Sequence, residues 1–230
     1  MLSFVGLAYQ NLDPLLPIKQ GYCVRNETSK YNENVFINCP FDAAYKKLFD
    51  AIVFAIFDCG FVARCALEED DGSQIRVRKI FNIISQCRLS IHDLSRVEAD
   101  KSTKLPRFNM PLELGTFLGA KHFGIGEHKN KACLILDREK YRYQKFISDI
   151  AGQDIKAHGN DPRSIIRVVR DWLRTYSRVS IPSGSVIWDR YHQLFEKDLP
   201  KLCKELKLKP KELIFNDYVL LVSKWLKINT

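Results

Sequence analysis

Short apolar segments alternate with amphipathic segments through most of the chain. The apolar segments have the length and composition of buried strands, and we expect strands at residues 34–38, 61–67, 87–93 and 132–136, with a short edge strand at 154–158. In the segments between and after them, apolar residues recur with a helical period. This pattern predicts helices at residues 41–59, 75–86, 107–121, 138–151 and 161–176, and two closing helices at 186–206 and 211–227.

Strands that alternate with helices predict a mostly parallel sheet covered by helices on both faces. Four or five such strands suit a flavodoxin-like, doubly wound α/β fold. We expect this domain at residues 34–160. It is preceded by an N-terminal arm at residues 1–33, in which Pro14 and Pro17 interrupt any long element, and it is followed by a C-terminal helical extension at residues 161–230 that packs on it.

Composition narrows the class of protein. A hydrophobic content of 46% is sufficient for a large core, and no apolar run is long enough to span a membrane. The start of the chain lacks the basic and apolar segments of a secretory signal. The seven cysteines have no C-x-x-C spacing, which indicates buried free thiols in a reducing cytoplasm, and the histidines also lack the spacing of a metal site.

The formal net charge is +9, and the excess of basic residues is larger in residues 151–230 than in the preceding part. Arginines recur along one face of the helix predicted at residues 161–176. Such a face is commonly solvated, but it also suits an anionic partner such as a nucleic acid or an acidic protein. The arginines are Arg163, Arg167, Arg170 and Arg174.

Polar and aromatic residues follow the first and third predicted strands. In a doubly wound sheet these two strands flank the point where the strand order reverses, and ligands bind in the crevice beyond their carboxyl ends. Asn38 and Phe41 leave the first strand, and His92 and Asp93 end the third. The helix that begins just before Glu113 should face them across this crevice. Topology therefore predicts a site that contains these five residues.

The chemistry of this crevice is narrowed by absent motifs. The chain has no G-x-G-x-x-G after the first strand, no G-x-x-x-x-G-K-[ST] and no G-x-S-x-G. Rossmann-type dinucleotide binding and P-loop nucleotide hydrolysis thus lack their phosphate-binding loops, and the missing elbow weighs against an α/β-hydrolase. The carboxylates Glu113 and Asp93 remain, with the acidic loop at residues 68–71 as a further candidate that is commonly only solvated. Paired carboxylates suit cleavage of an N-glycosidic bond, because an anion stabilises the oxocarbenium-like transition state or attacks C1′.

Four short motifs carry a resemblance to a known group. They are Pro40-Phe41 after the first strand, Gly60-Phe61 before the second, Ile91-x-Asp93 at the third, and Glu-Leu-Gly-x-x-Leu-Gly-Ala-Lys over residues 113–121. Over residues 34–137 the chain resembles the nucleoside 2-deoxyribosyltransferase-like proteins and the related TIR-like NAD hydrolases.

The resemblance implies a role for several residues. Glu113 takes the place of the catalytic glutamate, Asp93 takes the place of an aspartate that holds the sugar or base, and Asn38 and Phe41 line the pocket. It also implies an enzyme without a cofactor or a metal. Some TIR-like members deplete NAD in bacterial antiviral defence after activation by a protein partner or by self-assembly, so an activating partner or a homo-oligomer is a further expectation.

The segment before Glu113 departs from the family pattern. Deoxyribosyltransferases usually have an Asp-x-Gly-Thr-type run there, whereas this chain has Pro-Arg-Phe-Asn-Met-Pro at residues 106–111. This difference favours NAD or another nucleotide as the substrate over transfer between free nucleosides. Arg107 could then meet a phosphate, and we expect Asn109 and His92 to contribute to substrate binding.

Other interpretations of the same residues stay open. Glu113 could complement the helix dipole, Asp93 could form a turn after its strand, and His92 could be a buried strand residue. Gly115, Gly119 and Ala120 are interpreted as small residues that let their helix lie close to the sheet. At the level of the whole protein, the alternatives to an enzyme are a non-catalytic sensor of a nucleotide signal and an interaction module for protein or nucleic acid.

Overall fold

The computed structural model describes residues 27–97, 104 and 106–230. Its strands are β1 (Asn34–Asn38), β2 (Val62–Arg64), β3 (Leu89–Asp93), β4 (Ala132–Asp137) and β5 (Lys156–Ala157). Within the described residues they form one five-stranded sheet in the order β2-β1-β3-β4-β5, and every neighbouring pair is parallel. This is the order of a flavodoxin-like doubly wound sheet, and it confirms the predicted fold class.

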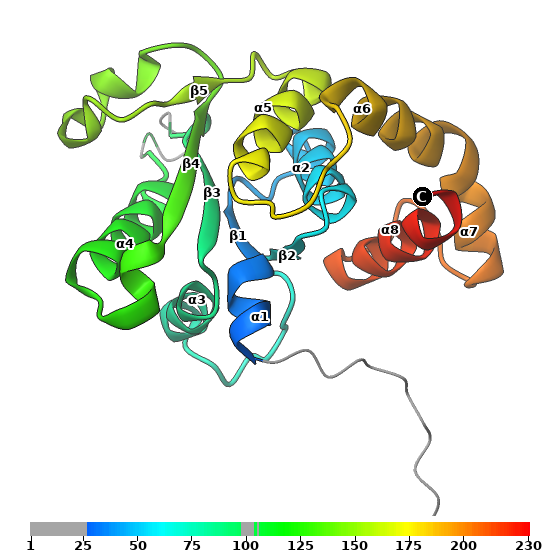
Figure 1. Cartoon of the computed structure of the whole chain (residues 1–230), viewed down its shortest axis with the longest axis horizontal. Coiled ribbons are helices and arrows are strands. Elements are labelled where there is room, and N and C mark those ends of the chain that lie inside the picture. Colours follow the sequence, from blue (N-terminus) through cyan, green and yellow to red (C-terminus); the bar gives the residue numbers. More distant parts are fainter. Residues whose placement is uncertain (1–26, 98–103, 105) are drawn as a thin grey trace, which may run out of the picture.

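The helices lie in layers on both faces of the sheet (Figure 1). They are α1 (Glu27–Glu33), α2 (Lys46–Asp58), α3 (Arg76–Ser85), α4 (Asn109–Phe123), α5 (Pro162–Arg174), α6 (Gly184–Gln193), α7 (Leu199–Glu205) and α8 (Phe215–Asn229). Helices α3 and α4 cover one face, and α2 and α5 cover the other. Helices α6 and α8 pack against α2, so the C-terminal helices with α7 form a further layer on its outer side.

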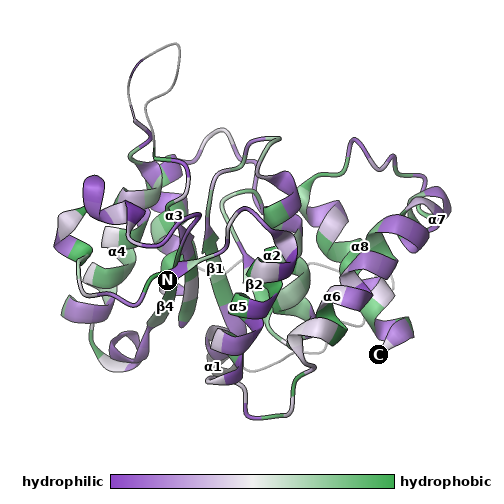
Figure 2. Cartoon of the chain, turned by 90° about the horizontal axis from the view of Figure 1, so that it is seen from above, coloured by the Kyte–Doolittle hydropathy of each residue, from purple (hydrophilic) through white to green (hydrophobic). Residues whose placement is uncertain are grey.

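The alternation of side chains along β1 divides the core into two parts. Val35 and Ile37 pack with the residues of α2 and α5, whereas Phe36 packs with those of α3 and α4. Figure 2 shows the strands as mainly hydrophobic and the outer parts of the helices as more hydrophilic. Both faces of the sheet are therefore buried, as a parallel sheet requires.

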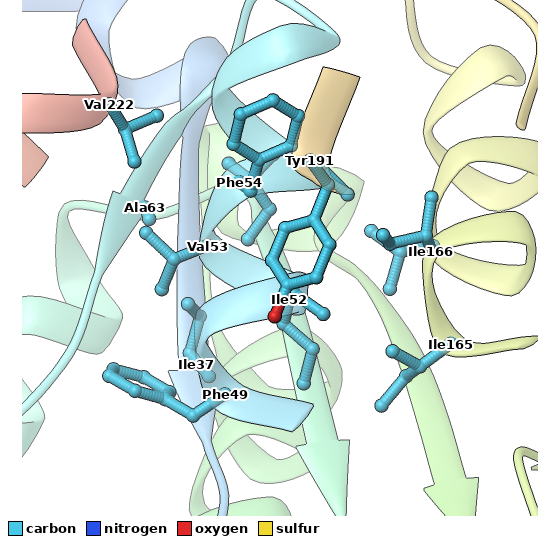
Figure 3. Close-up of a cluster of buried hydrophobic side chains, with 14 of the residues drawn as sticks. Ile37, Phe49, Ile52, Val53, Phe54, Ala63, Ile165, Ile166, Tyr191 and Val222 are labelled. Carbon is cyan, nitrogen blue, oxygen red and sulfur yellow. The ribbon is translucent and has the colours of Figure 1, made fainter. Parts of the chain in front are cut away.

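Helix α2 is buried on all sides, because the sheet lies against one side and the C-terminal helices against the other. All residues from 48 to 56 are buried. The ring of Phe54 lies 5.6 Å from that of Tyr191 in α6 and 6.0 Å from that of Trp225 in α8. Figure 3 shows Phe54 and Tyr191 together at the centre of this cluster, with Ile166 of α5 nearby. The C-terminal helices therefore share one continuous core with the α/β domain.

The prediction of a helix at residues 138–151 is wrong. The chain forms two short 3-10 turns there, Arg142–Lys145 and Ser148–Ile150. Tyr141 has a left-handed backbone with φ of 60°, which interrupts a right-handed helix. Arg142 is turned inward, where its Nε donates a hydrogen bond of 2.9 Å to Oδ1 of Asp137. A buried ion pair between Arg142 and Asp137 thus holds this segment, which does not form the expected α-helix.

The domain boundaries stay a prediction. Helix α5 begins after the expected boundary at residue 160, with Asp161 capping its first backbone N–H groups, and it lies beside α2 in the layer that covers the sheet. The arm expected at residues 1–33 lies outside the described residues up to residue 26, and α1 forms its end. The expected helix at 186–206 is observed as α6, a π-helical turn at Leu194–Asp198, and α7.

In the part of the chain that the structure describes, no helix has both the length and the apolar character needed to cross a membrane. The cysteines in this part are free, and all except Cys133 are buried. The expectation of buried free thiols is confirmed for the described cysteines other than Cys133, which is only partly buried.

Candidate functional site

A buried hydrogen-bond network joins the carboxyl ends of β1 and β3 to the start of α4. Nδ2 of Asn38 donates one hydrogen bond to Nδ1 of His92 (2.9 Å) and another to the backbone oxygen of Met110 in the first turn of α4 (2.8 Å). Since Nδ1 of His92 accepts, Nε2 carries the hydrogen and donates to Oγ of Ser90 at 2.9 Å. Asn38 therefore fixes the position of α4 relative to the sheet edge.

His92 is fully buried and neutral. Burial lowers the pKa of His92 to about 3. Its ring makes edge contacts with the rings of Phe36 and Phe117, at centroid distances of 5.9 and 5.5 Å. His92 thus supports the floor of the site through its hydrogen bond with Asn38. Direct contact between His92 and a substrate stays a prediction.

Glu113 follows Met110 by about one turn of α4, and only 8% of the residue is exposed. Among the described residues, no group forms a hydrogen bond or an ion pair with its carboxylate. Burial raises the pKa of Glu113 to about 7, and the positive charge of Arg76 opposes this rise only in part. Glu113 is therefore a desolvated carboxylate that titrates near neutral pH.

The glycines that follow Glu113 do not let α4 approach the sheet. A Cβ atom added at Gly115 or Gly119 would have no atom within 4 Å. The two glycines therefore face open space, and the interpretation of them as close-packing residues is wrong. The packing of α4 depends instead on Leu114 and Phe117, which are almost completely buried.

Asp93 belongs to a different network from Glu113. The hydroxyl of Tyr45, just before α2, donates a hydrogen bond to Oδ2 of Asp93, and Nε2 of His158 lies 3.0 Å from the same oxygen. The backbone N–H of Ser95 donates to Oδ1 at 2.7 Å. Burial alone would raise the pKa of Asp93, but His158, Ser95 and Tyr45 together hold it below its usual value. Asp93 is fully buried, and its predicted contact with a sugar stays a prediction.

A cavity of about 470 Å³ opens beside the carboxyl end of β1. Three segments form its walls: residues 40–50 with the start of α2, residues 66–79 with the start of α3, and residues 213–218 at the start of α8. The apolar and aromatic residues of the lining are Pro40, Phe41, Ala43, Phe49, Ala66, Leu67, Leu213, Ile214, Phe215 and Tyr218. A predominantly apolar pocket with several polar groups is the usual form of a small-molecule site.

Some of the charged side chains of the lining have partners within the cavity wall. Nζ of Lys46 is 2.9 Å from Oδ1 of Asp50, and Nζ of Lys79 donates to the backbone oxygen of Glu69 at 2.6 Å. Arg76 has no hydrogen bond or ion pair with any residue in the described ranges. Arg76 lines the cavity, and its positive charge opposes the rise in the pKa of Glu113, whereas Glu113 itself is not among the lining residues.

The structure brings together only some of the predicted site residues. Phe41 lines the cavity and is 36% exposed. Arg107 lies outside the lining, and its Nη1 is 3.6 Å from Oδ2 of Asp42. Asn109 begins α4 and is exposed. For Arg107 and Asn109, substrate contact stays a prediction.

Sequence reasoning missed the part of the site that comes from distant segments. Arg76 and Phe215 are examples, because no local pattern shows that the starts of α3 and α8 meet beside β1. The acidic run at residues 68–71 was the available signal for this wall, because it lies shortly before Arg76 and the start of α3. For Phe215 the sequence offers no comparable signal.

The basic face predicted for residues 161–176 is partly occupied by contacts within the chain. Nε of Arg170 donates to the backbone oxygen of Pro182 at 2.7 Å, and Nη1 of Arg174 donates to that of Ser177 at 3.3 Å. Arg163 and Arg167 are exposed. Binding of a nucleic acid through this face stays a prediction.

Fold and site together define a doubly wound α/β protein with a buried glutamate in α4 and a cavity beside the carboxyl end of β1, whose lining does not include this glutamate. Within the described ranges no three His, Cys, Asp or Glu residues are grouped so as to hold a metal ion. Comparison of the chain with protein-family models, with curated proteins and with solved structures finds no match.

Proposed function

We propose that the protein is an N-glycosidase that acts on NAD or on a related nucleotide or nucleoside, with Glu113 as its catalytic residue. The observation that carries the proposal is the state of Glu113: a carboxylate that is 8% exposed, has no partner in the described part of the chain, and has a pKa raised to about 7. Carboxylates with a strongly shifted pKa are characteristic of functional sites.

A purely structural role accounts poorly for this glutamate. An acid that complements a helix dipole belongs on the exposed surface of the first turn or in a hydrogen bond to the backbone. Glu113 has neither arrangement, and its burial disfavours the charged form. Functional sites commonly retain such an unfavourable group because the reaction requires it.

The proposed reaction breaks the bond between C1′ of the ribose and the nitrogen of the base. As the bond breaks, its electron pair leaves with the base and positive charge develops on the sugar. The carboxylate of Glu113 stabilises this charge or forms a bond to C1′, and water then supplies the hydroxyl group at C1′ while its second proton is released. For NAD the leaving group is nicotinamide, which departs as a neutral molecule.

Other residues have supporting roles in the proposal. Phe41 offers an exposed aromatic surface to the base. Arg76 lines the cavity, and its positive charge partly offsets the rise in the pKa of Glu113. Asn38 is a positioning residue that holds the first turn of α4. Asp93 is proposed to act through the conformation of the sheet edge, because Tyr45 and His158 enclose its carboxylate.

The proposal is tested by incubating the purified protein with NAD, nucleosides and nucleotides and separating the products by chromatography. We expect release of nicotinamide or of another free base, and a loss of at least a hundredfold in Glu113→Gln. Glu139→Gln is the matched control, because the side chain of Glu139 is 65% exposed and, among the described residues, forms an ion pair with the neighbouring Arg138. Undiminished turnover in folded Glu113→Gln would exclude the role of Glu113.

A non-catalytic sensor of a nucleotide signal is the second proposal. The start of α8 forms a wall of the cavity, so that an occupied cavity would contact the C-terminal helices directly. Tight binding of a nucleotide without any product would favour this function over the enzyme. An activating protein partner or a homo-oligomer belongs to either proposal, and gel filtration with and without ligand would detect self-assembly.

A further inference from the structure

The C-terminal helices form one wall of the cavity, although they follow the α/β domain in the sequence. The contributing residues are Leu213, Ile214, Phe215 and Tyr218. Phe215 is the first residue of α8 and is 8% exposed. The cavity therefore has an aromatic residue that lies more than a hundred residues beyond Glu113 in the chain.

Three phenylalanine rings follow one another along the cavity. The rings of Phe41 and Phe49 are 5.4 Å apart and perpendicular, and those of Phe49 and Phe215 are 5.9 Å apart with an interplanar angle of 40°. They come from the loop after β1, from α2 and from α8, and all three residues line the cavity. Rings in such a series offer both faces and edges to a planar ligand.

Two hydrogen bonds hold the start of α8 against opposite walls of the cavity. The hydroxyl of Tyr218 donates to the backbone oxygen of Asp50 in α2 at 2.9 Å. Nδ2 of Asn216 donates to the backbone oxygen of Glu68, in the loop after β2, at 3.1 Å. Phe215 directly precedes Asn216 and lies three residues before Tyr218, so the two hydrogen bonds hold its part of α8 in the cavity wall.

We propose that Phe215 is a specificity-determining residue of the site, which forms an apolar contact with the planar base of the substrate. This inference rests on the proposed function and deepens it, because it assigns the recognition of the base to the C-terminal helices. It requires a ligand with an aromatic heterocycle. Contact between a base and an aromatic ring contributes to binding with little dependence on the identity of the base.

The proposed contact is separate from the reacting atoms. Phe215 is therefore expected to act on binding of the substrate and to leave the chemical step unchanged. We expect Phe215→Leu to raise the KM for the substrate about tenfold while kcat changes less than twofold. Phe215→Tyr keeps the ring and should restore the KM to within about twofold of the original value.

The experiment measures kcat, KM and Tm for both variants with NAD as the first probe, and binding of NAD by calorimetry. Leucine replaces phenylalanine with an apolar side chain, which limits the loss of packing. Leu220→Ala is the matched control, because Leu220 lies on the same helix and is 54% exposed. A raised KM in Phe215→Leu alone, with recovery in Phe215→Tyr, supports the proposal.

Other outcomes separate this inference from the proposed function. An unchanged KM in folded Phe215→Leu overturns the inference and leaves the glycosidase intact. Equal losses of kcat and Tm in Phe215→Leu and Phe215→Tyr assign Phe215 to folding alone and also overturn it. If NAD binds without turnover and binding weakens in Phe215→Leu only, the inference holds while the enzymatic proposal fails. If neither NAD nor any nucleoside or nucleotide binds, both fail.

Discussion

His92 and Asp93 are neighbours on β3, yet their side chains belong to networks on opposite faces of the sheet. His92 binds Asn38 and contacts Phe117 of α4, whereas Asp93 binds Tyr45 at the start of α2. Because side chains alternate along a strand, only His92 faces the helix that carries Glu113. Asp93 is thus held in a network that does not include Glu113, and Glu113 has no hydrogen-bond or ion-pair partner among the described residues.

The ionisation of Glu113 should reduce stability. Its folded pKa of about 7 lies above the ordinary value of 4.5, so the folded state retains a proton that the unfolded state releases between these values. The contribution of Glu113 to the free energy of unfolding is therefore fully present below about pH 4.5. It is lost as the pH rises through 7, and the loss amounts to about 3 kcal/mol. Glu113→Gln should be more stable than the original protein at pH 8 and equally stable at pH 4.5, as measured by urea unfolding. An equal difference at both pH values would contradict this account.

The pH dependence of base release should have the opposite direction. Glu113 must be ionised to stabilise positive charge on the sugar, and its pKa is raised to about 7. We expect kcat/KM to rise with pH and to reach a plateau above about pH 7. The measurement is a pH profile of nicotinamide release with a control for stability at each pH. A rate that falls through this range would show that the protonated form is the active one.

Asn38→Ala should disturb both stability and the site. The substitution leaves the backbone oxygen of Met110 and Nδ1 of His92 without their donor, and the cost should be about 2 kcal/mol or more. The start of α4 should also shift, which would lower the rate of base release. Asn130→Ala is the control, since the side chain of Asn130 is exposed and makes one long bond of 3.3 Å. Thermal unfolding that is equally affected by both substitutions would refute the role of Asn38.

Tyr45→Phe should destabilise the protein by about 1–3 kcal/mol, because it removes a donor from the fully buried carboxylate of Asp93. The folded pKa of Asp93 is lowered, so its contribution is present above the unfolded value near pH 4 and is lost as the pH falls through the folded value. The effect of Tyr45→Phe should therefore be largest near neutral pH. Tyr141→Phe, at a residue 69% exposed, should change the unfolding midpoint little.

Alanine at Gly115 or Gly119 should stabilise α4. A Cβ atom at either position meets nothing within 4 Å, and alanine is favoured over glycine inside a helix by about 0.5–1 kcal/mol. Gly124→Ala provides the contrast, because its Cβ would lie 2.2 Å from the backbone oxygen of Ala120. We expect Tm to rise for the first two variants and to fall for the third. A lower Tm for Gly115→Ala or Gly119→Ala in the isolated monomer would disprove this assignment.

Local patterns were sufficient to predict the sheet. The apolar run at residues 34–38 coincides with β1, and the order of strands and helices indicated the doubly wound topology that the structure has. The helix predicted at residues 138–151 failed, because apolar spacing does not reveal the left-handed backbone of Tyr141 or the inward turn of Arg142. Such features depend on a tertiary partner, which here is Asp137.

The site was predictable only in part, for the same reason. Topology placed Asn38 and Glu113 near one another, and the bond from Asn38 to the backbone of Met110 agrees with this placement. Sequence order alone could not show that Tyr45 donates a hydrogen bond to Asp93 or that Phe215 lines the cavity. Those contacts join segments far apart in the chain, and they arise when the helical layers assemble.

The complete burial of α2 has a consequence for how the protein unfolds. Residues 48–56 contact the sheet on one side and the C-terminal helices on the other, so neither partner can separate without exposing an apolar helix to water. Cooperative, two-state unfolding is the behaviour expected of such an arrangement. We therefore expect the described part of the chain to melt in a single transition, and a fragment that ends before α6 to be insoluble.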